Sequence, residues 1–117
     1  MKTKSQSPES WASDPQPHAL RVEVSNERSL LLPHNEFLFS ELTSNGKEQS
    51  LRLVFATHEV VVHGHSLRRI ETAMQRAELS MLTVLSPNDQ RLIPDGQPKI
   101  SRIIVAEVAD LSAKTSQ

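Results

Sequence analysis

The sequence contains no cysteine and no tyrosine, three glycines, and a 3% share of aromatic residues among its 117 positions. Without cysteine, the chain forms no disulfide, no thiolate nucleophile and no cysteine-held zinc or iron–sulfur site. Three glycines are too few for a glycine-rich phosphate-binding loop. The few aromatic residues leave little to stack on single-stranded nucleic acid. These absences remove several common enzyme and cofactor classes.

Neither sign of charge dominates, since 13 basic and 14 acidic residues give a formal net charge of -1. A chain with so little net charge has no global field to attract nucleic acid or an anionic membrane surface. Its apolar runs fall far short of the roughly 20 residues that a membrane-spanning helix needs. In a secretory signal an apolar segment follows the basic residues. No such segment follows Lys2 and Lys4. We therefore predict a soluble, cytoplasmic protein with no membrane and no nucleic-acid partner.

The two ends of the chain are polar, and the middle carries the apolar residues. Residues 1–18 are rich in serine, proline, lysine, glutamate and glutamine, a composition that cannot offset the entropy of ordering. We predict a disordered N-terminal tail over residues 1–18, a single folded domain over 19–108, and a flexible C-terminal tail over 109–117. Trp11 is the one aromatic residue of the first tail. It is either a solvated aromatic or an anchor for a partner or for the core.

Alternation of apolar and polar residues predicts several short strands. In the best of them, Glu59 to His63, Val60 and Val62 should face the core while Val61 faces the other way. An Asn45–Gly46 pair between two such segments predicts a hairpin, because it tolerates the positive φ angles of a tight turn. The expected strands cover residues 20–24, 30–32, 37–42, 51–55, 59–63, 81–85 and 100–108, where 30–32 could equally be a buried loop.

One segment has the spacing of a helix. Leu67, Ile70, Met74 and Ala77 recur at helical intervals, and Ser66 is suited to cap the first turn. One amphipathic helix packed on one face of a small, mostly antiparallel sheet of about five or six strands is an α+β fold. We predict that class.

The joint between the best strand and the helix concentrates the chemistry of the chain. A helix start offers free backbone N–H groups, and glycine allows a ligand to come close to them. Two basic side chains in the first turn add positive charge where the helix dipole disfavours it. This pattern predicts an anion-binding site at Gly64, His65, Ser66, Arg68 and Arg69. The alternative is that the arginines extend into solvent or pair with acidic residues such as Glu71, and that the glycine is a backbone hinge.

A metal site is a second interpretation of the same joint. His63 and His65 are two residues apart on an extended segment, and Glu59 lies on the same face of a regular strand. Three such ligands could satisfy a catalytic zinc site. No HExxH pattern accompanies them, so a pair of surface histidines at a strand end explains the same residues.

The composition and motifs favour association over catalysis. A small sheet must cover its second face or leave apolar groups exposed, and its edge strands can pair with another chain. The leading hypothesis is a non-enzymatic interaction or adaptor module that binds a copy of itself or another protein and holds no cofactor. A ligand-binding or regulatory domain with the anion site, and a metal-dependent enzyme with the His63, His65 and Glu59 set, are the alternatives.

Overall fold

The computed structural model of the chain describes residues 9–108 and is mostly β-structure, with 55% strand and 16% helical content. Its strands form two sheets of four strands each. Sheet A has the order β1-β7-β2-β3, and sheet B has the order β4-β5-β6-β8. The elements are β1 (Trp11–Ser13), β2 (Ala19–Ser25), β3 (Arg28–Pro33), η1 (His34–Glu36), β4 (Phe37–Asn45), β5 (Glu48–Phe55), β6 (His58–His65), α1 (Arg68–Gln75), β7 (Leu79–Thr83), α2 (Pro87–Gln90) and β8 (Lys99–Glu107).

The predicted α+β class, with one sheet of about five or six strands, is therefore wrong. Among the described residues, α1 is the one helix of seven residues or more, and two separate sheets supply most of the core. Alternation in a sequence shows which side of a strand is buried but not which strands pair. The single predicted sheet is in fact two sheets that share one hydrophobic core.

Sheet B is antiparallel throughout and carries the strongest sequence patterns. Its inner face is built from cross-strand rows of aliphatic residues, and Val60 and Val62 are fully buried as the alternation predicts. The Asn45–Gly46 hairpin between β4 and β5 is confirmed, with a φ of 68° at Gly46. Such a φ is in the left-handed region that favours glycine. The members of the inner rows that are buried are Leu51, Leu53, Phe55, Val60, Val62, Ile100 and Ile103.

Sheet A contains pairings that the sequence does not reveal. Strand β7 runs parallel to β2 and antiparallel to β1. It therefore pairs with two N-terminal strands that are both far from it in the chain. Residues 11–13 form β1 within the segment predicted to be disordered, so that description does not hold for them. Ser10 is fully buried and its hydroxyl accepts a hydrogen bond from the Ile100 N–H at 3.2 Å, while Trp11 packs against the core. The predicted tail residues 1–8 and 109–117 lie outside the described part of the chain.

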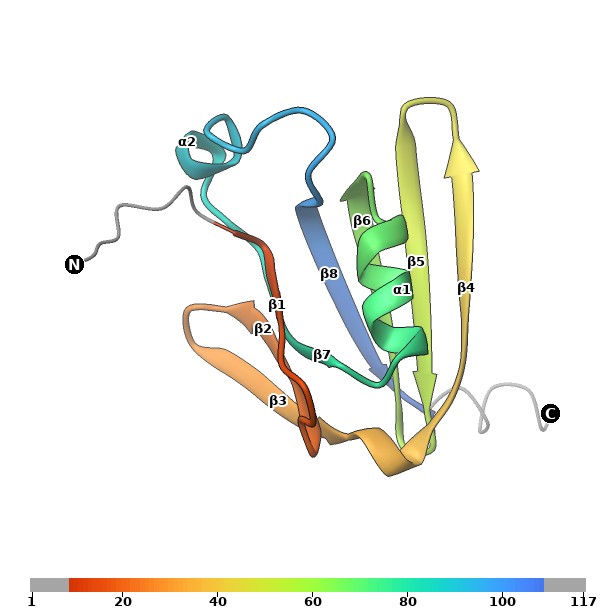
Figure 1. Cartoon of the computed structure of the whole chain (residues 1–117). Coiled ribbons are helices and arrows are strands. Elements are labelled where there is room, and N and C mark those ends of the chain that lie inside the picture. The colour runs from red at the N-terminus through yellow and green to blue at the C-terminus, as the bar shows by residue number, and fades with distance from the viewer. Residues whose placement is uncertain (1–8, 109–117) are drawn as a thin grey trace, which may run out of the picture.

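Helix α1 lies over the inner face of sheet B and beside β7 of sheet A (Figure 1). Ile70, Ala73 and Met74 are its buried residues, and Leu67 just before it is also fully buried. The helical spacing therefore predicts the buried face correctly except at Ala77, which is exposed and has a φ of 56° just beyond the helix end. No helix among residues 9–108 is both long and apolar enough to cross a membrane.

Candidate functional site

Gly64 lies on β6 opposite Ile100 of β8. It is buried, and the pairing of the two strands shifts by a β-bulge between His63 and Gly64. A Cβ atom added at Gly64 would lie 1.9 Å from the carbonyl oxygen of Lys99, well inside van der Waals contact. The glycine is therefore required by a neighbouring strand, and this contact explains it without a ligand.

The start of α1 already has hydrogen-bond partners from the protein. The N–H of Leu67 donates to the side-chain oxygen of Gln49 at 2.7 Å. Leu67 occupies the N-cap position without a side-chain cap, and Ser66 has a φ of 57°, so the expected serine cap does not form. The Nδ1–H of His65 donates to the carbonyl oxygen of Lys47 at 2.7 Å. The β4–β5 hairpin thus holds the joint through Gln49 and Lys47.

The five residues of the predicted anion site do not share one pocket. His65 and Ser66 line a depression with residues of the loop that precedes β8, including Asp95. Arg68 and Arg69 line a different groove, between α1 and β1. Arg68 is 3.8 Å from the carboxylate of Glu71, as the alternative interpretation expects, and Arg69 donates to the side-chain oxygen of Gln97 at 2.7 Å.

The three residues of the predicted metal site are likewise apart. Glu59 and His63 are four residues apart on β6, which places their α-carbons roughly 13 Å from each other. Glu59 is bonded to Arg52, and His63 shares a 3.0 Å hydrogen bond with the hydroxyl of Ser50. Within residues 9–108, no group of three histidine or carboxylate side chains is placed to hold a metal ion.

The outer face of sheet B is the surface on which exposed apolar and charged residues gather. We define it by three cross-strand rows, each running from β4 to β8. Phe39 and Ile104 on this face are 47% and 45% exposed, a high fraction for such large apolar side chains. The rows are Phe39–Val54–Glu59–Ala106, Glu41–Arg52–Val61–Ile104 and Thr43–Ser50–His63–Arg102.

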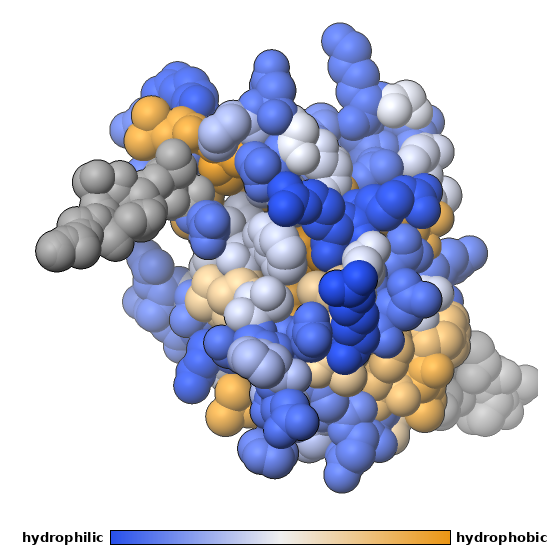
Figure 2. Space-filling view, viewed as in Figure 1, coloured by the Kyte–Doolittle hydropathy of each residue, from blue (hydrophilic) through white to orange (hydrophobic). Residues whose placement is uncertain are grey.

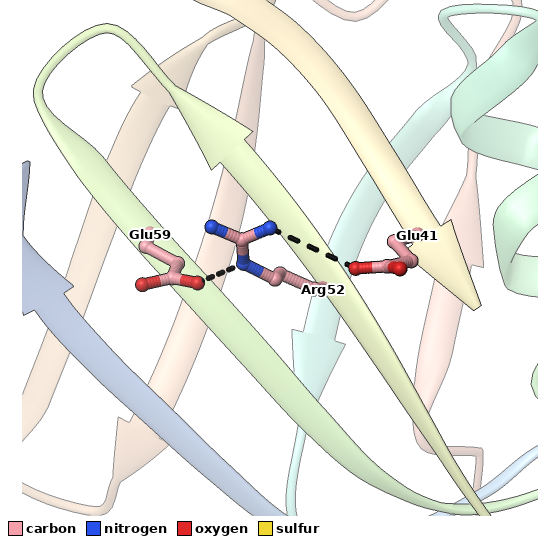
Figure 3. Close-up of polar contacts among 3 residues, drawn as sticks. All are labelled: Glu41, Arg52 and Glu59. Carbon is pink, nitrogen blue, oxygen red and sulfur yellow. Dashed lines mark hydrogen bonds and ion pairs between the residues drawn. The ribbon is translucent and has the colours of Figure 1, made fainter. Parts of the chain in front are cut away.

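Arg52 is at the centre of the charged groups on this face. Its side chain reaches from β5 to Glu59 on β6 and to Glu41 on β4, the latter at 3.7 Å (Figure 3). Its guanidinium carbon also lies 5.4 Å from the ring centre of Phe39, within cation–π range. The hydrogen bond to Glu59 raises the pKa of the Arg52 guanidinium, and attraction to Glu59 and Glu41 acts in the same direction against partial desolvation. Arg52 therefore keeps its charge, and two acidic partners balance it.

The alternation predicts that Val61 points away from the core and that a small sheet has a second face to cover, but it does not predict which residues of other strands share that face. The missing information was the register, which places Phe39, Val54, Val61 and Ile104 from four different strands beside one another. Comparisons with known proteins give no match: no protein-family model fits this chain, and no curated protein or solved structure is significantly similar to it.

Proposed function

We propose that the protein is a non-enzymatic interaction module that associates with a second copy of itself through the outer face of sheet B. The observation that carries this proposal is the combination of Phe39, Arg52 and Ile104 on one exposed sheet face. Aromatic residues and arginine are enriched in the buried centres of protein interfaces, where they contribute much of the binding free energy. Two such sheet faces pack against each other by interdigitating their side chains.

The charges of this face favour a second copy as the partner. Glu41 and Glu59 contribute two negative charges, and Arg52 and Arg102 contribute two positive ones, so the face is neutral when His63 is neutral. In a two-fold symmetric dimer the same face meets itself, and a face with a net charge would repel its copy. Because Arg52 is already bonded to Glu59 and near Glu41, it stays paired when water leaves the interface.

The size of the face predicts a weak dimer. Four strands at a spacing of about 4.8 Å and eight residues at about 3.4 Å each give a face of roughly 500 Å². Stable complexes bury about 800 Å² on each partner. We therefore expect association in the micromolar range rather than an obligate dimer.

Sedimentation equilibrium of the full chain across a wide concentration range tests this proposal. We expect a reversible monomer–dimer equilibrium with a dissociation constant of about 10 μM, so that the dimer is dominant above about 100 μM and the monomer below about 1 μM. A chain that remains monomeric at millimolar concentration would contradict self-association.

A further inference from the structure

A groove between β1 and α1 lies apart from the outer face of sheet B. It has a volume of about 400 Å³, within the range of small-molecule sites, and is open to solvent. Trp11 and Ser13 line it from β1, Arg69 and Thr72 line it from α1, and Arg76 lines it from the C-cap position just after the helix. Arg68, Ala73 and Glu78 complete the lining.

Positive charge is concentrated in this groove although the whole chain is slightly negative. Three arginines and one glutamate line it, a charge of +2, and the ion pair of Arg68 with Glu71 leaves +1 against -1 for the chain. Arg69 and Thr72 are three residues apart on one face of α1, and Arg76 follows four residues later at the C-cap. Figure 2 shows deep blue, strongly hydrophilic side chains over the position that α1 occupies in Figure 1. An anionic ligand would complement this surface.

The chemistry of the arginines narrows the class of anion. A guanidinium group is planar and donates paired hydrogen bonds that match the oxygens of a phosphate or carboxylate. Arg69 donates to the side-chain oxygen of Gln97 at 2.7 Å, and this amide oxygen does not neutralise the guanidinium. Arg68 and Arg69 also lie in the first turn of α1, where positive charge is disfavoured by the helix dipole and a bound anion would relieve the repulsion.

Trp11 adds a planar apolar surface to the same groove. Its side chain is half-buried, packs against the core on one side and contributes to the groove lining. An indole ring stacks well on a planar heterocycle, and stacking does not depend on the identity of the base. Ala73, which is buried in the helix, gives the groove a further apolar lining residue.

We propose that this groove binds a mononucleotide, with its phosphate held by Arg69 and Arg76 and its base against Trp11. The site goes beyond self-association, because none of its lining residues belongs to the outer face of sheet B. It also differs from the predicted site at Gly64 to Arg69, since it uses Trp11 and Arg76 and leaves out Gly64, His65 and Ser66.

Trp11 makes this proposal simple to test. It is the one tryptophan of a chain without tyrosine, so the intrinsic emission of the protein excited at the indole band reports on the groove alone. Adenosine monophosphate should change this emission saturably, with a dissociation constant at or below the millimolar range. Adenosine and inorganic phosphate should each bind at least about tenfold more weakly, because each lacks one of the two groups that the groove contacts.

Matched variants separate the arginines of the groove from general charge effects. The double variant Arg69→Gln with Arg76→Gln should bind adenosine monophosphate at least about tenfold more weakly, since charge-assisted hydrogen bonds to phosphate are lost. Arg21→Gln removes an exposed arginine on β2, outside the groove, and should bind like the wild type.

Several results would overturn the proposal. They are the absence of a saturable change at millimolar adenosine monophosphate, equal binding of adenosine or of phosphate alone, and equal affinity of the double variant and the wild type. The circular dichroism spectrum of each variant verifies its folding independently of the emission.

Discussion

Replacing Gly64 with alanine is expected to destabilise the protein by at least about 3 kcal/mol, a large part of the 5–15 kcal/mol that holds a typical domain folded. The added Cβ would lie 1.9 Å from the Lys99 carbonyl oxygen, 3.0 Å from the Lys99 carbonyl carbon and 3.1 Å from the Ile100 α-carbon. These are all backbone atoms, so no side-chain rotation can relieve the overlap. The β6–β8 pairing must separate locally, and Ile100 would leave the core with it.

Gly46→Ala is the matched control for this variant. Gly46 has a φ of 68° and open space around the position of a Cβ, so alanine adds backbone strain there without a clash. That strain costs about 1 kcal/mol. In urea unfolding, Gly64→Ala should shift the midpoint by on the order of 2 M, and Gly46→Ala by less than half of this. Similar midpoints for the two variants would show that β6 and β8 do not approach each other as described.

Replacing Ile104 with glutamate is expected to weaken self-association more than a hundredfold. Ile104 is in the central row of the outer face of sheet B, beside Val61. A carboxylate there would have to be buried without a partner in the dimer, and the apolar contact of the isoleucine would be lost as well. The combined cost is at least about 3 kcal/mol, which corresponds to more than two decades in the dissociation constant.

Leu31→Glu provides the control for Ile104→Glu. Leu31 is on β3 in sheet A and is 59% exposed, slightly more than Ile104 at 45%. Both substitutions put the same charge on an exposed strand position, and only Ile104 is on the proposed interface. Sedimentation equilibrium should therefore show the dimer for Leu31→Glu and a monomer for Ile104→Glu. Equal dissociation of the two variants would assign the effect to net charge instead of the interface.

Local structure could be predicted where a residue pattern determines it. The alternation through Val60 and Val62 predicts their burial, the Asn45–Gly46 pair predicts a hairpin, and the spacing of Leu67, Ile70 and Met74 predicts the inner face of the helix. Each of these depends on neighbours within a few residues. The backbone conformation of a short segment and its buried side thus follow from the sequence.

The pairing of distant strands could not be predicted in this way. Nothing in Leu79 to Thr83 indicates that it lies parallel to β2 and also pairs with β1, which has the short sequence Trp11–Ser13 in a polar segment. The α+β prediction fails for this reason, because long-range pairing divides the strands between two sheets.

The candidate sites depend on the same long-range information. The sequence places Arg68 and Arg69 close to His65, whereas the fold places β1, with Trp11, beside them. Likewise, the residues around Gly64 suggest a ligand-binding loop, but the close backbone of the paired strand β8 explains the glycine. In both cases residues that are distant in the chain decide the role of a local motif.

An isotope-filtered NOE experiment on a mixture of labelled and unlabelled protein tests the proposed interface most directly, since it records contacts between two copies without any substitution. Face-to-face packing predicts intermolecular NOEs at the methyl groups of Val54, Val61 and Ile104, and none at Leu31 or Leu92, which are exposed elsewhere. Intermolecular NOEs confined to Leu31 or Leu92, or none at all at millimolar concentration, would contradict association through this face.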